Sequence, residues 1–199
     1  MKILLTVLIT LAVLVLAALA FIFSGIYDVS ATSPDSGLVY WALDTARGRS
    51  VHRAAEALEG KVTVPDLADP ARFKNGFVHY HAMCASCHSA PGVSMSEIGQ
   101  GLNPSPPLLS RVGAEDEPEE LFWVIKNGIK MTGMPAFGVT HTDEDLWSIV
   151  AFLRKMGSLS SEDYQALVDE AGLGPPSEEH HHDDAEGHAH APGTEPHQH

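Results

Sequence analysis

Cys84-Ala85-Ser86-Cys87-His88 is the most informative segment of this chain of 199 residues. It holds both cysteines of the sequence, three positions apart and followed directly by a histidine. Two cysteines cannot build a disulfide scaffold, and a bond between these two would close only a very short loop with little entropic value. The pair is therefore expected to act chemically rather than as a structural cross-link.

The spacing C-x-x-C-H is the pattern at which a haem is attached through two thioethers while the adjacent histidine binds the iron. A thioredoxin-like redox pair would need a βαβ context, whereas a helix leads into Cys84 here. A structural zinc site would need four ligands, and the nearest second pair is His79 with His81. The predicted cofactor is one covalent haem c on Cys84 and Cys87, with His88 as an axial iron ligand.

Met134 is the predicted second axial ligand of the iron. It lies in Thr132-Gly133-Met134-Pro135-Ala136-Phe137-Gly138, where glycine and proline indicate a loop rather than a packed helix face. A thioether in such a loop suits the side of the iron opposite His88. Met131 is the alternative, and Met134 is preferred because Pro-Ala-Phe-Gly follows it.

The rest of the chain shows helical spacing of apolar residues and no alternating pattern typical of strands. Capping signals support this, among them Asp69-Pro70 and a capping box at Thr142 and Asp145. The soluble part is therefore expected to be all-α, with long irregular loops. Helices are predicted over residues 36–59, 70–84, 118–128, 142–157 and 162–171.

Gly76 lies eight residues before the first cysteine and Tyr80 four before it, while Asp145, Ile149 and Phe152 follow one another on the last long helix. With the haem motif, these residues make about 70–157 resemble a small monohaem class I cytochrome c. In that family the glycine and the aromatic residue let the first helix cross closely over the last. The resemblance implies that fold around a covalent haem, and it covers fewer than half of the residues.

A proline-rich segment, Gly101-Leu102-Asn103-Pro104-Ser105-Pro106-Pro107-Leu108, resembles the family's loop whose backbone carbonyl orients the iron-binding histidine. The sequence leaves open whether Pro104 or Pro107 provides this carbonyl. Several apolar side chains are expected to cover the macrocycle, to fill the core, or to do both: Phe77, Tyr80, Leu102, Leu108, Phe137 and Trp147.

The resemblance implies a one-electron carrier rather than an enzyme, because His88 and Met134 would occupy both faces of an iron cycling between Fe(III) and Fe(II). Its expected partners are respiratory membrane complexes, a quinol-oxidising one as donor and a terminal oxidase or reductase as acceptor. The alternative is a haem-relay subunit of a larger membrane oxidoreductase, such as a dehydrogenase, an oxidase or a nitrogen-oxide reductase.

Residues 3–23 form an apolar run long enough to cross a bilayer as a helix of roughly 30 Å. Ala18-Leu19-Ala20 has the letters of a signal-peptidase site, but the apolar run continues through it, so residues 1–27 are predicted to be an uncleaved signal-anchor. Lys2 precedes the run and Asp28 follows it. The positive-inside rule therefore predicts a single-pass inner-membrane protein with its haem domain on the periplasmic side.

Residues 28–69 are expected to form a juxtamembrane helix and a linker. One interpretation is a spacer that lies on the membrane surface or on the domain. The other is a docking helix for a membrane partner, which Arg47, Arg49 and Arg53 favour.

The formal net charge of -14 is concentrated at the C-terminus, since residues 158–199 have ten acidic and no basic side chains. This balance disfavours binding to nucleic acid. A short helix is expected within 158–174, followed by a disordered acidic, His-rich tail over 175–199. The tail's composition suits weakly bound Cu(II), Ni(II) or Zn(II), so metal handling is the alternative to a solvated tail.

Overall fold

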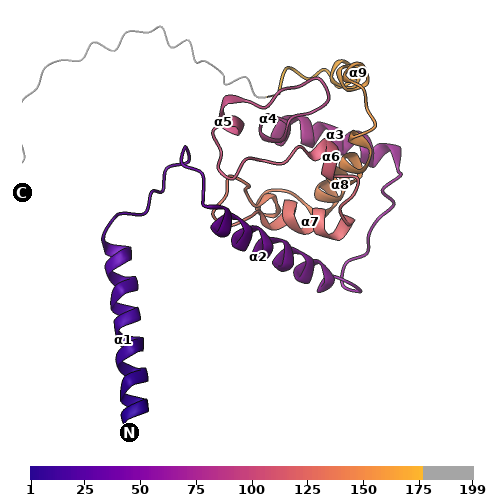
Figure 1. The fold of residues 1–199 in the computed structure, drawn as a ribbon. Helices are drawn as coiled ribbons and strands as arrows, with labels where there is room; N and C mark the ends of the chain where they lie inside the picture. The colour runs from indigo at the N-terminus through magenta and orange to yellow at the C-terminus, as the bar shows by residue number, and fades with distance from the viewer. Residues whose placement is uncertain (177–199) are drawn as a thin grey trace, which may run out of the picture.

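The computed structural model describes residues 1–176, and its regular elements in this range are all helical, as expected. Figure 1 shows a long N-terminal helix that stands apart from a bundle of shorter helices. The elements are α1 Lys2–Phe23, α2 Gly37–Glu56, α3 Pro70–Met83, α4 Ala85–His88, α5 Glu97–Gln100, α6 Leu109–Val112, α7 Pro118–Asn127, the 3₁₀ helix η1 Phe137–Val139, α8 Asp143–Met156 and α9 Ser161–Ala171.

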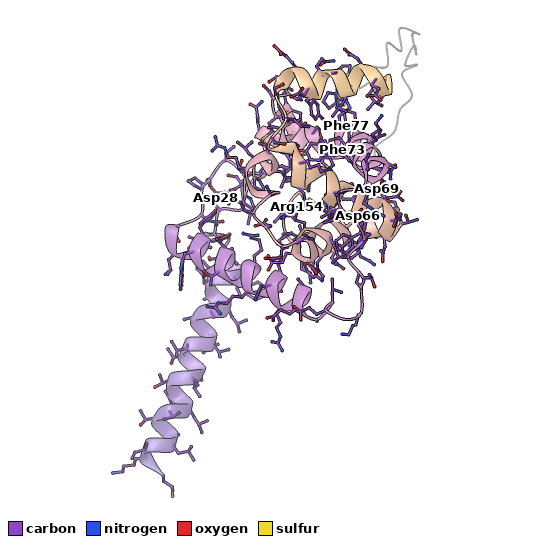
Figure 2. All side chains as sticks on the ribbon, turned by 90° about the vertical axis from the view of Figure 1, so that its right-hand side faces the viewer. Asp28, Asp66, Asp69, Phe73, Phe77 and Arg154 are labelled. Atoms are coloured by element: carbon purple, nitrogen blue, oxygen red, sulfur yellow. The ribbon has the colours of Figure 1, made fainter. Side chains whose placement is uncertain are left out.

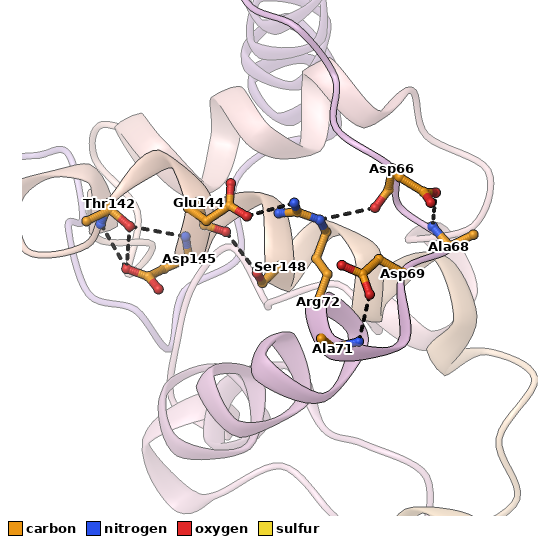
Figure 3. Close-up of polar contacts among 9 residues, drawn as sticks. All are labelled: Asp66, Ala68, Asp69, Ala71, Arg72, Thr142, Glu144, Asp145 and Ser148. Atoms are coloured by element: carbon orange, nitrogen blue, oxygen red, sulfur yellow. Dashed lines mark hydrogen bonds and ion pairs between the residues drawn. The ribbon is translucent and has the colours of Figure 1, made fainter.

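The two central helices, α3 and α8, begin at the capping signals that the sequence predicts. The Asp69 carboxylate accepts a hydrogen bond from the Ala71 N–H at 2.9 Å, with Pro70 at the first helical position. At the start of α8, Thr142 and Asp145 form the expected capping box (Figure 3). These caps satisfy backbone N–H groups that have no partner inside the helix.

The two helices cross in direct backbone contact at Gly76. A Cβ atom built on Gly76 would lie only 1.8 Å from the carbonyl oxygen of Ser148 on α8, so glycine alone permits this approach. Tyr80, Ile149 and Phe152 are almost completely buried around the crossing. The expected close crossing of the first and last helices of the domain is therefore confirmed.

Arg72 links the linker before α3 to the start of α8. Its Nη2 lies 2.7 Å from Oε1 of Glu144, and its Nε donates to the carbonyl oxygen of Asp66 at 3.1 Å (Figure 3). The guanidinium of Arg72, on α3, thus bonds to both neighbouring segments by charge-assisted hydrogen bonds.

Helix α9 packs on the outer side of the crossing. The ring centroid of Tyr164 lies 5.4 Å from that of Phe77, which also contacts Phe152. Figure 2 shows Phe73 and Phe77 among the side chains beneath α9. The buried His81 joins this contact, because its Nε2 lies 2.8 Å from the Gly174 carbonyl and must donate to it. Its Nδ1 then accepts from the Tyr164 hydroxyl at 3.0 Å.

Helix α2 runs along α7 and buries Val51 and Ala55 against the domain. It ends at Glu56, earlier than the predicted residue 59. Beyond that point the N–H of Leu58 donates to Ala55 and that of Glu59 to Glu56, so the chain tightens into turns before Gly60.

Helix α1 has a mean hydropathy of 3.0 over its most apolar window and buries none of its residues. It is the one helix within residues 1–176 that is long and apolar enough to cross a membrane. A signal sequence at the N-terminus would have the same properties. The predicted tail and its histidines from residue 177 onward lie outside the described residues.

Candidate haem site

The three residues of the attachment motif lie in a single helical turn. Cys84 caps the C-terminal end of α3, and its carbonyl accepts hydrogen bonds from the N–H groups of Cys87 at 3.1 Å and His88 at 2.8 Å. Both thiols are free, with Cys84 buried and Cys87 half-buried. The turn therefore presents two thiols and an imidazole from one short piece of backbone.

The imidazole of His88 is oriented by the proline-rich loop. Its Nδ1 lies 2.9 Å from the carbonyl oxygen of Pro107. Since a carbonyl only accepts, Nδ1 must hold the proton, which leaves the lone pair of Nε2 available to a metal. Burial lowers the pKa of His88, although the bond to Pro107 opposes this, and a lower pKa favours the neutral ring that can bind a metal. The carbonyl that the sequence left open between Pro104 and Pro107 is thus that of Pro107.

The segment over residues 96–107 packs against the attachment turn and against the methionine loop. The Ser96 N–H donates to the Ser86 carbonyl at 2.8 Å. A Cβ on Gly99 would lie 3.0 Å from the Cα of Cys87, and one on Gly133 would lie 2.7 Å from a methyl carbon of Leu102. One loop therefore connects the turn that holds His88 to the loop that holds Met134.

Met134 is fixed by hydrogen bonds on both sides of its backbone. Its carbonyl accepts from the Ile129 N–H at 3.2 Å, and its N–H donates to Oγ1 of Thr132 at 3.1 Å. Gly128, at φ +64°, ends α7 and lets the loop return, since a Cβ there would lie 2.7 Å from the Met134 carbonyl. Met134 is half-buried, whereas Met131 is 92% exposed, which favours Met134 as the ligand.

The donor set fits a covalently attached haem better than the zinc alternative. Both ring nitrogens of His81 are hydrogen-bonded, to Tyr164 and Gly174, so neither is available to zinc. Nε2 of His79 lies 3.5 Å from Asp145. Burial raises the pKa of the Cys84 thiol to about 12, which keeps it in the form that does not bind metals. Among residues 1–176 no group of three or more metal-ligating side chains comes together.

The side chains expected near the macrocycle differ in their surroundings. Tyr80 is fully buried and donates its hydroxyl proton to the Ser89 carbonyl, while Trp147 stacks on Phe122 with ring centroids 4.3 Å apart. Phe77 contacts the rings of His81, Phe152 and Tyr164, which makes it part of the core next to α9. Leu102 and Phe137 are half-buried, and Leu108 is 40% exposed.

Two positioning features went unrecognised in the sequence. Thr132 reads as an ordinary loop residue, yet its hydroxyl holds the N–H of Met134. Gly99 gives no signal beyond being a glycine, although it is the point at which α5 touches Cys87. Neither contact has a periodicity or motif of its own, so only the fold reveals them.

Comparison with known families agrees with this site. Residues 71–153 match the family described as cytochrome C oxidase, cbb3-type, subunit III. This segment is therefore a cytochrome c domain, and it contains Cys84, Cys87, His88 and Met134. The family covers less than half of the chain and leaves α1, α2 and α9 outside. A search of curated proteins found no match.

Proposed function

We propose that this protein is a membrane-tethered carrier of single electrons between respiratory redox complexes on the outer face of the membrane. The observation that carries the proposal is the attachment turn, in which two free thiols stand beside an imidazole whose Nδ1 is fixed by Pro107. The cytochrome c domain of residues 71–153 supports the electron-transfer role. Helix α1 supports the tether.

Each part of the site has a separate task in this proposal. Cys84 and Cys87 hold the haem through thioethers, which makes its position permanent. Pro107 keeps the His88 ring in the tautomer whose Nε2 binds iron. Thr132 and Ile129 hold the backbone of Met134, whose thioether would be the second ligand to the iron. When bound, the haem supplies an iron that alternates between Fe(III) and Fe(II), and methionine ligation favours the reduced form.

The ligand assignment is tested by comparing Met134→Ala with Met131→Ala in the holoprotein. Met134→Ala is expected to abolish the weak charge-transfer absorbance of methionine bound to ferric iron and to lower the reduction potential. Met131→Ala is the matched control, because this neighbouring side chain is 92% exposed. If Met131→Ala has these effects and Met134→Ala does not, the assignment is wrong.

Covalent attachment and the tether are tested on the protein purified from its membrane. A pyridine haemochrome spectrum of the c type and loss of two-thioether attachment in Cys84→Ser are expected. The intact mass should equal 21.3 kDa for the chain plus one haem. A mass that lacks the first 20 residues would mean that α1 is a cleaved signal sequence.

A second candidate function is a haem relay inside a larger membrane oxidoreductase. The name of the matched family, an oxidase subunit, favours it. Purification in mild detergent separates the two. A carrier that only collides with its partners elutes without other chains. A subunit of a complex co-elutes with other chains at a fixed stoichiometry.

A further inference from the structure

The outward face of α2 is apolar near its start and basic near its end. Val51 and Ala55 mark the side that packs on the domain. With 3.6 residues per turn, Ala46 lies roughly 140° around the helix from Val51, so its row faces the opposite side. In Figure 2 a row of α2 side chains points away from the domain. The apolar members of this face, all exposed, are Leu38, Val39, Ala42, Leu43 and Ala46.

The spacing of the apolar residues in this row is typical of a helix face that packs against an apolar environment. Val39, Ala42, Leu43 and Ala46 follow the i, i+3, i+4, i+7 pattern. Leu38 and Leu43 expose 72% and 61% of their surface, although the other side of the same helix is packed on α7. An exposed apolar stripe of this kind on a helix that is already docked indicates a second surface beyond the domain.

The basic end of the same face provides charge of the sign that phospholipids attract. Arg49 and Arg53 line a shallow hollow in the surface of α2, together with Ser50 and Ala54. Within the described part of the chain neither arginine forms an ion pair, whereas Arg47 is paired with Asp44. Arg49 and Arg53 lie one turn apart, so α2 has two unpaired positive charges close together on this face.

The position of α2 in the chain brings this face close to the bilayer. Only residues 24–36 separate α1 from α2. Fully extended, 13 residues reach at most about 45 Å. The segment is shorter than that here, because Tyr27 donates to Asp35 and Asn103 donates to the Ser33 carbonyl, which also pins the segment to the domain. A bilayer crossed by α1 therefore lies within reach of the outward face of α2.

From these observations we infer that the outward face of α2 lies in the headgroup region of an anionic bilayer, with the apolar stripe inserted and Arg49 and Arg53 on lipid phosphates. The inference rests on the proposed function, because it needs α1 to be a membrane anchor. Since Val51 and Ala55 join α2 to the domain, such insertion would hold the whole haem domain in one orientation on the membrane rather than on a free tether.

The test uses the full-length holoprotein in lipid nanodiscs with a spin label at one introduced cysteine. Leu43→Cys places the label on the apolar stripe, and Gln165→Cys places it on the exposed side of α9 as a control. In discs that contain phosphatidylglycerol, the ratio of oxygen to nickel-chelate collisions is expected to be several-fold higher at position 43. Arg49→Gln with Arg53→Gln should lower this ratio, and Lys61→Gln with Arg111→Gln, which removes the same charge elsewhere, should not.

The possible outcomes distinguish failure of the α2 inference from failure of the proposed α1 anchor. If the chain is found in the discs but the labels at positions 43 and 165 give equal ratios, α2 does not enter the bilayer and the inference fails while the anchor stands. A label at 43 that is shielded from both reagents would indicate a protein partner or a second copy and would overturn it too. A chain that never enters the discs refutes the anchor instead.

Discussion

The α3–α8 crossing and the α2–α7 contact are both helix–helix packings, yet they differ in almost every physical respect. At the crossing the backbones touch at Gly76, and the surrounding aromatic and branched side chains are almost fully buried. Along α2, only Val51 and Ala55 are buried, and charged side chains lie at the edge of the contact. The first packing defines the domain that holds the haem motif, whereas the second attaches an added helix to it.

The difference shows that one chain combines a haem motif held by tight packing with an added helix held by few contacts. The haem motif follows α3 directly, so any shift at the crossing is passed to Cys84 and His88. The α2 contact is far from this motif in sequence and depends on few buried groups. Substitutions at the crossing should therefore affect both folding and the site, and those in α2 should mainly affect how the domain is attached.

Gly76→Ala is the change with the largest expected effect. The added Cβ would lie 1.8 Å from the Ser148 carbonyl, so α3 and α8 would have to separate. We expect a loss on the order of 3 kcal/mol or more in the free energy of unfolding, measured by denaturant titration of the holoprotein. Haem incorporation should fall with it.

Gly48→Ala is the matched control, because a Cβ there meets no atom within 4 Å and the residue lies inside α2. It should leave haem incorporation unchanged and stabilise α2 by about 1 kcal/mol through helix propensity. If Gly48→Ala lowered the free energy of unfolding and haem incorporation as much as Gly76→Ala, the two helix contacts would not differ in the way described.

Tyr164→Phe tests the contact between α9 and the α3–α8 crossing. The effect expected is smaller than that of Gly76→Ala. The change keeps the ring against Phe77 but removes the hydroxyl that donates to Nδ1 of the buried His81. An acceptor left without a partner in the core costs about 1–3 kcal/mol. We expect a lower denaturation midpoint with an unchanged reduction potential. Stability equal to that of the original protein would mean that water replaces the hydroxyl and that α9 is not fixed by this bond.

The crossing could be predicted from the sequence because strong local signals coincide there. Asp69-Pro70 and the Thr142–Asp145 box mark helix starts, and Gly76 and Tyr80 have fixed distances from Cys84. The short elements α4, α5, α6 and η1 have three or four residues each, too few for a periodicity, so the sequence does not predict them. The choice of Pro107 over Pro104 depends on a contact between segments far apart in the sequence. The role of Thr132 depends on a contact within an irregular loop. Residue spacing predicts neither contact.

The α2–α7 contact contains a histidine whose pKa is shifted by its partners. Nδ1 of His52 lies 2.7 Å from Oε1 of Glu120 on α7, and its Nε2 lies 3.5 Å from Glu56 on its own helix. The hydrogen bond to Glu120, with help from the charge of Glu56, raises the pKa of His52. The folded-state pKa therefore exceeds that of the unfolded chain, near 6.5. Its contribution is fully present below about pH 6.5 and is lost as the pH rises through the folded-state pKa.

His52→Gln should therefore loosen α2 at acidic pH and have no effect at alkaline pH, and this is the smallest effect predicted because the imidazole is 65% exposed. Protection of the α2 amides against hydrogen exchange, corrected for the intrinsic rate at each pH, measures it. Val51→Ala provides the comparison, since it removes a buried apolar contact of roughly 1.5 kcal/mol that no proton affects. If His52→Gln had no effect even at acidic pH, the pair with Glu120 would not hold α2, and the helix would be attached by its apolar residues alone.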